Sequence, residues 1–380
     1  MIHFSKGFSL AWAAALVLTS AAPSILAQSR SEIVIGMSMP LTGFNAAAGQ
    51  EGLAVAKAYF ERVNRSGGIA GNKISLLVLD DAFDAQRAAA NARTAIDAKA
   101  VAIFNCWGTS SCSAMMPVIT RAGVPMVAGI AGGGPMRKAA GRYAFNVRAT
   151  TEREIARMVN QMLTVGQDHI ALIFQDDAFG KSGQEAAASV FASTKVRPVV
   201  ELAVKADGSN ASEVVAALAK LPQLNGVVLV AAPPATLKLI PRAREAGLAV
   251  QFYNLAAQAN TKVASDLGKY TAGVVFTTLV PSPWSERFPV VREYQQIYSA
   301  ATGKTTYSYL GLEVFINAKV LTEGLRRAGS EVTPESLTKA LESLPELRFG
   351  PMGIAYGASD HEGSTYVGLT IIDRRGHFVE

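Results

Sequence analysis

The sequence predicts an α/β protein of two lobes, each a doubly wound parallel β-sheet with helices on both faces. The chain has 380 residues, which is long for a single core and suits two domains of ordinary size. Short apolar runs alternate with segments of helical periodicity almost from end to end, an order typical of parallel sheets. The alternation restarts after residues 143–148, so we expect two successive series of strands and helices.

The first series begins at Ile33–Met37, a short apolar run that predicts a buried strand. A helix is expected at 49–64, because Leu53, Ala56 and Phe60 recur on one helical face. The other elements expected in this series are strands at 74–79, 101–104 and 124–128 and helices at 85–98 and 113–122.

The second series has the same plan and a longer ending. Its expected helices lie at 152–165, 180–192, 211–220 and 235–246, and its expected strands at 170–174, 196–202, 226–230 and 250–253. An extended run at 273–277, helices at 289–301, 308–328 and 334–344, and an extended tail ending at 366–372 complete the chain.

Composition narrows the classes of function. Hydrophobic residues make up 49% and charged residues 17% of the chain, which indicates a folded protein rather than a disordered one. The net charge of +6 comes from scattered basic residues, whereas a nucleic-acid partner would require a clustered stripe. We therefore expect no nucleic-acid partner.

The N-terminus reads as a signal peptide over residues 1–27. Lys6 precedes an apolar run from Phe8 to Leu18, and Ala27 ends an acceptable cleavage site before Gln28. The run is short for a membrane anchor, and no cysteine near the cleavage point offers a site for a lipid. The sequence thus predicts export to the periplasm as a soluble mature chain.

Cys106 and Cys112 are the only cysteines of the chain. In an oxidising compartment such a pair can form a disulfide, and we expect one here. The histidines of the mature chain are distant in sequence from these thiols, so no metal site is expected.

Two loops that follow strands are candidates for ligand binding, because ligands of open α/β sheets bind beyond the carboxyl ends of the strands. The first contains Trp107, Gly108, Thr109 and Ser110 at the start of a helix, where free amide groups attract carboxylate or phosphate. The alternative is that Thr109 or Ser110 only caps its own helix. Both readings stay open at this stage.

The second loop, residues 129–134, contains Ala131, Gly132 and further glycines. Its backbone could approach a ligand closely, although a tight turn is the simpler interpretation. Its pattern matches neither a dinucleotide fingerprint nor a P-loop.

Acidic pairs raise the question of catalysis. Asp176 and Asp177 follow one strand, and Asp80 and Asp81 follow another. Adjacent side chains on an extended segment point apart, which favours helix capping over acid–base chemistry. No matching histidine, nucleophile or metal-ligand set accompanies these acids, and the G-x-S-x-G elbow of a Ser–His–Asp hydrolase is missing. The sequence therefore predicts neither an enzyme nor a cofactor.

Several short motifs together resemble the Leu/Ile/Val-binding protein family, the type I periplasmic solute-binding proteins of ABC importers. The motifs, in order along the chain, are Pro40-Leu41-Thr42-Gly43, Glu61-Arg62-Val63-Asn64, Gly67-Gly68-Ile69, Asp80-Asp81, Gly123-Val124-Pro125, Phe145-Asn146-Val147-Arg148, Asp176-Asp177-Ala178-Phe179-Gly180 and Gly368-Leu369-Thr370-Ile371-Ile372-Asp373. Each motif is weak alone, but their order and spacing cover essentially the whole mature chain.

The resemblance implies two lobes joined by three crossing segments. Candidate crossings are Ala144–Thr150, Gly273–Thr278 and Phe349–Ala355. One lobe would then comprise residues 28–147 with 276–350, and the other residues 148–275 with 351–380.

The resemblance also assigns ligand-binding positions. Loops matching Trp107–Ser111 and Ile130–Gly133 hold the carboxylate of an amino acid in the family, and Phe179 falls at an aromatic lip of the other lobe. Ala256 occupies the position of the acidic residue that holds the ammonium group. The resemblance further implies that Phe44, Asn45, Thr278 and Tyr309 line the site.

The implied function is that of a monomeric solute-binding protein that delivers its ligand to an ABC permease in the inner membrane. The ligand would be a small organic molecule: a carboxylate such as an aromatic or aliphatic acid, or an amino acid. The missing acid at Ala256 favours a ligand without an α-ammonium. A ligand-sensing subunit of the same fold and an exported α/β enzyme are the alternatives.

Overall fold

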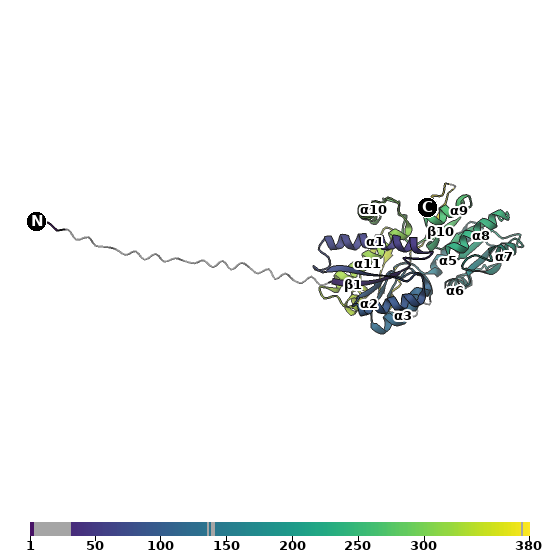
Figure 1. Ribbon diagram of the computed structural model, residues 1–380. Helices are drawn as coiled ribbons and strands as arrows, with labels where there is room; N and C mark the ends of the chain where they lie inside the picture. Colours follow the sequence, from purple (N-terminus) through teal and green to yellow (C-terminus); the bar gives the residue numbers. More distant parts are fainter. Residues whose placement is uncertain (4–31, 135–136, 138–140, 374) are drawn as a thin grey trace. The chain divides into compact units, whose positions relative to one another are not determined.

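The computed structural model describes residues 1–3, 32–134, 137, 141–373 and 375–380. The predicted signal peptide lies, apart from residues 1–3, outside the described residues. The described residues from 32 onward contain two large β-sheets (Figure 1).

The first sheet is parallel and has the strand order β2-β1-β3-β4-β5. Its strands are β1 (Glu32–Met39), β2 (Lys73–Asp80), β3 (Ala102–Phe104), β4 (Met126–Val127) and β5 (Ala144–Phe145). Strands β1 and β2 pair in register from Glu32 opposite Lys73 to Met39 opposite Asp80. Because both strands end at the same level, the loops that follow them lie side by side.

Helices cover both faces of the first sheet. They are α1 (Ala46–Arg65), α2 (Ala85–Asp97), α3 (Thr109–Ala122), α10 (Pro289–Thr302), α11 (Tyr309–Ala328) and α12 (Pro334–Glu342). Figure 1 shows α1 and α11 on one side of β1, and α2 and α3 on the other. Side chains alternate along β1: Ile33 and Ile35 pack towards α1 and α11, and Val34 packs towards α2 and α3.

The second sheet has the order β14-β13-β10-β9-β8-β6-β7. Its strands are β6 (Ile170–Gln175), β7 (Val200–Val204), β8 (Gly226–Val230), β9 (Gln251–Asn254), β10 (Val275–Thr278), β13 (Gly368–Ile372) and β14 (Phe378–Val379). Its helices are α5 (Thr151–Thr164), α6 (Ala178–Ala192), α7 (Ala211–Leu218), α8 (Pro233–Glu245) and α9 (Thr261–Leu267). Helices α5 and α6 share one core cluster with the sheet, and α7, α8 and α9 pack on the opposite face.

The predicted fold class is confirmed, with differences at the edges of the second sheet. Strand β13 runs antiparallel to β10, where the sequence predicted parallel sheets, and β14, a strand that the sequence did not predict, pairs antiparallel with β13. Strand β7 begins at Val200 rather than 196. Pro198 explains that shift, because its nitrogen carries no hydrogen for the strand ladder.

The chain passes between the two sheets three times. The first passage follows β5, and the third follows the small antiparallel pair β11 (Leu347–Phe349) and β12 (Met352–Ile354). The second passage follows β10 instead of coinciding with it: the predicted crossing Gly273–Thr278 is wrong in position, because 275–278 pair with β9 and β13 inside the second sheet. The lobe boundaries given above remain predictions.

Candidate functional site

The N-terminus of α3 presents an uncapped first turn. Its N-cap residue is Gly108, which has a positive φ of 84° and no side chain to cap the helix. Thr109 and Ser110 are the first two helical residues, Thr109 being buried and Ser110 exposed. The first-turn amides therefore donate to no N-cap side chain, which leaves them as donors for an anion.

Two loops are joined at this helix start. The Gly108 amide donates to the Ile130 carbonyl at 3.1 Å, and the Ile130 amide donates to the Cys106 carbonyl at 2.7 Å. A disulfide joins Cys106 to Cys112 across the first turn of α3, with their Cα atoms 5.5 Å apart. These links restrict the conformations of the segment from Trp107 to Ser111.

Glycines bring the loop after β4 into close contact with helices of both sheets. A Cβ on Gly133 would lie 2.7 Å from Thr109 Cγ2 and 3.1 Å from Ser182 Oγ of α6. A Cβ on Gly132 would lie 2.4 Å from Thr151 Oγ1 at the start of α5. Ala131, beside them, is buried. The loop thus lies where α3 of the first sheet meets α5 and α6 of the second.

Asp177 caps α6. Its Oδ1 accepts a hydrogen bond from the Gly180 amide at 2.9 Å, which confirms the capping role predicted for it. Asp176 is exposed and lies 3.9 Å from Lys181. Phe179, in the first turn of α6, is half-buried against the core of the second sheet.

A buried carboxylate lies beside Ala256. The Ala256 amide donates to Glu154 Oε2 at 2.8 Å, and the Thr277 hydroxyl donates to the same oxygen. Burial raises the pKa of Glu154, an effect that Arg148 and these hydrogen bonds oppose. Glu154 was not predicted as a site residue, because an acid in the first turn of a helix is ordinarily explained by the helix dipole.

The other predicted site residues lie in two different parts of the structure, and Phe44 and Asn45 lie just before α1. Phe44 is exposed and makes an edge-to-face contact with Phe83, with ring centroids 5.4 Å apart. Asn45 is the N-cap residue of α1 and makes no side-chain capping bond.

Thr278 lies instead in β10, inside the second sheet between β9 and β13, and Tyr309 lies at the start of α11, against Phe378 of the edge strand β14. Thr278 is buried opposite Gly368. Tyr309 is buried and makes edge-to-face contacts with Trp284 and Phe378.

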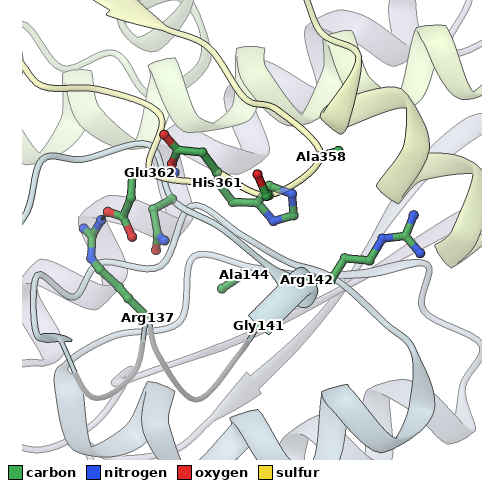
Figure 2. Close-up of a pocket in the computed structure, with 10 residues that line it drawn as sticks. Arg137, Gly141, Arg142, Ala144, Ala358, His361 and Glu362 are labelled. Carbon is green, nitrogen blue, oxygen red and sulfur yellow. Dashed lines mark hydrogen bonds and ion pairs between the residues drawn. The ribbon is translucent and has the colours of Figure 1, made fainter.

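A polar cavity of about 290 Å³ is lined by Arg137, by residues of 141–146 and by residues 358–362 (Figure 2). Arg137 pairs with Glu362, and the Arg142 Nε lies 2.6 Å from Glu342. His361 stacks on Phe145 at 4.0 Å, and burial lowers its pKa, although Glu342 opposes that effect. Each guanidinium therefore already has a carboxylate partner. The Arg137–Glu362 pair joins the segment before β5 to the segment that follows β12.

Neither a metal cluster nor a membrane span is found in the described part of the chain. No group of three or more His, Cys, Asp and Glu side chains there could hold a metal ion. Among the same residues, no helix is both long and apolar enough to cross a membrane.

Comparison with known proteins identifies the family. Residues 32–376 match the periplasmic binding protein family. A Leu/Ile/Val-binding protein homologue of Brucella suis is 25% identical over 368 residues, which cover 92% of this chain and 88% of that protein.

Solved structures share the fold. An extracellular ligand-binding receptor from Verminephrobacter eiseniae is 25% identical and superimposes with a TM-score of 0.83, covering 92% of this chain and 100% of that one. The branched-chain amino acid transporter substrate-binding protein of Streptococcus pneumoniae, solved with isoleucine, has a TM-score of 0.78 at 15% identity, covering 92% and 98% of the two chains. Since the family match spans nearly all of the described chain, the protein belongs to the periplasmic binding protein family, whose members are solute-binding proteins rather than enzymes.

Proposed function

We propose that the protein binds a small carboxylate between its two lobes and delivers it to an ABC permease of the inner membrane. The observation that carries the proposal is the uncapped start of α3, where Thr109, Ser110 and the first-turn amides offer donors to an anion. The links to Ile130 and between Cys106 and Cys112 hold these donors in place before the ligand arrives. Preorganised donors lose less entropy on binding.

The second lobe supports a ligand without an α-ammonium group. Residues 254–260 contain no Asp or Glu, and Ala256 stands where the family resemblance implies an acid. Glu154 lies next to Ala256, but its Oε2 already accepts bonds from the Ala256 amide and the Thr277 hydroxyl. A buried ammonium without a partner costs several kcal/mol.

Transport is the role that the relatives favour. The Brucella suis relative is named a Leu/Ile/Val-binding protein homologue, and the family as a whole works in the periplasm. Ligand would bind the closed arrangement of the lobes better than the open one, and the permease would recognise the closed form. Export through a cleaved signal peptide over residues 1–27 is part of this proposal.

Calorimetric titration tests the proposal directly. We expect heat of binding with phenylacetate or a related carboxylate and none with leucine, valine or phenylalanine. Micromolar binding of any of these amino acids would refute the absence of an ammonium site and leave the solute-binding role intact. Failure of every carboxylate to bind would refute the carboxylate assignment.

A further inference from the structure

We propose that Phe83, together with Phe44, forms an aromatic subsite for a planar ring on the carboxylate ligand. This inference rests on the proposed function and narrows the ligand to an aromatic carboxylate. Phe83 was not among the residues that the sequence marked for the site.

The two rings come from adjacent loops. Met39 and Asp80 are paired at the ends of β1 and β2, so the loops that follow these strands leave the sheet side by side. Phe44 is 64% exposed and Phe83 is 36% exposed. Their rings meet edge to face, with centroids 5.4 Å apart and planes at 77°. Large exposed apolar side chains gathered in one place are typical of a binding surface.

Asp80 joins these two loops. Its Oδ1 accepts hydrogen bonds from the amides of Leu41 at 2.8 Å and Ala82 at 2.9 Å, and its Oδ2 accepts one from the Thr42 hydroxyl at 2.6 Å. One carboxylate thus holds both the segment leading to Phe44 and the segment leading to Phe83. It acts as a positioning residue for the ring pair.

The backbone at Phe83 is held in an unfavourable conformation. Ala82 and Phe83 have φ angles of 48° and 65°, in the left-handed region that non-glycine residues rarely adopt. Asp81 fixes the turn, since its Oδ1 accepts from the Phe83 amide at 2.9 Å and its Oδ2 from the Ser38 hydroxyl at 2.9 Å. Strain retained by such specific bonds is characteristic of functional sites.

The Phe83 ring lies directly against the start of α3. A Cβ on Gly108 would come within 2.6 Å of Phe83 Cε2 and 2.9 Å of its Cζ. A ligand whose carboxylate is held by the first-turn amides would therefore have its next atoms beside this ring. Rings favour offset or edge-to-face contact with a third ring, which an aliphatic group of equal size cannot reproduce.

A matched pair of ligands tests the subsite. Phenylacetate and cyclohexylacetate share the carboxylate and similar size but differ in aromaticity. We expect wild-type protein to bind phenylacetate about three- to tenfold more tightly than cyclohexylacetate by calorimetry. Phe83→Leu should abolish this preference while both acids still bind. Phe83→Tyr should retain it.

The control is Tyr270→Leu, which removes a partly exposed ring beside α9 and should leave the preference unchanged. Thermal unfolding of each variant shows whether it is folded. Equal affinity of wild type for the two acids, or a preference that survives in folded Phe83→Leu, overturns the aromatic subsite alone. Binding of neither acid overturns this inference, and failure of every carboxylate to bind overturns the proposed function as well.

Discussion

Single carboxylates at this site hold loops rather than perform chemistry. Burial alone would raise the pKa of Asp80. Hydrogen bonds outweigh this effect and lower the pKa to about 2; they come from the Thr42 hydroxyl and from the amides of Ala82, Leu41 and Thr42. A carboxyl whose pKa is lowered in the folded state stabilises the protein above its unfolded pKa. That stabilisation is lost as the pH falls through the folded value.

Asp80→Asn should therefore lower the free energy of unfolding at pH 7 by about 1–3 kcal/mol. The difference from wild type should shrink between the ordinary pKa of 3.8 and pH 2, because wild-type Asp80 becomes protonated there. Urea unfolding from pH 2 to 7 measures this. Asp97→Asn, which changes an exposed carboxylate of α2, is the control and should show a much smaller effect.

The hydroxyls at the start of α3 provide a second prediction at this scale. Ser110→Ala and Thr109→Val should each weaken phenylacetate binding by about 1–3 kcal/mol, because each removes a donor to the carboxylate. Thr120→Val, at the exposed far end of the same helix, should bind as wild type does. Unchanged affinity in folded Ser110→Ala would contradict the assignment of the anion site.

At the scale of elements, the disulfide restricts the turn between β3 and α3. Both Cys106 and Cys112 are fully buried, and six positions separate them. Replacing both with Ala should destabilise the fold by about 2 kcal/mol, the loop-entropy contribution of so short a loop. Calorimetry should also show weaker carboxylate binding, since the loop must be ordered on binding.

Reducing agent provides the control for this prediction. It should lower the unfolding midpoint of wild-type protein in urea towards that of the double variant and leave the variant itself unchanged. An equal response of both proteins would show that the effect does not come from this disulfide.

The sequence predicted the elements better than it predicted their contacts. Apolar periodicity was sufficient for α1, α11 and the central strands, because burial of one face determines both the pattern and the structure. The antiparallel direction of β13 was missed, since strand direction depends on distant partners, and β14 was not predicted as a strand.

The same limit applies to the candidate site. The sequence marked Trp107–Ser110 through their position after a strand, but it missed Glu154 and Phe83. Glu154 is recognised only by its contact with Ala256, which is far away in the chain. Phe83 is recognised by a positive φ and by its contact with Gly108, neither of which has a local sequence signature.

At the scale of the whole molecule, a buried ion pair joins the first passage to α11. Arg148 Nε and Nη2 lie 2.8 and 3.0 Å from the two carboxylate oxygens of Glu313, and both side chains are buried. Such a bidentate pair fixes geometry as well as supplying energy. It ties the segment leading into the second sheet to a helix that covers the first.

Glu313→Gln should destabilise the protein by about 3–5 kcal/mol, because it removes the carboxylate that is hydrogen-bonded to the buried Arg148 guanidinium. The double variant Arg148→Met/Glu313→Leu removes both charges and should recover part of that loss, because buried Glu154 then loses the attraction of Arg148. Urea unfolding of the single and double variants measures the difference. If the double variant is as unstable as the single one, packing rather than charge explains the effect.

The absence of a side chain at Gly133 has a consequence for how this chain can diverge. The space that a methyl group would need there is filled by Thr109 of α3 and Ser182 of α6. A larger residue at 133 would push α3 and α6 apart. Substitution at this position therefore requires compensating substitutions at 109 and 182. Residues 109, 133 and 182 should therefore covary among close relatives of this chain.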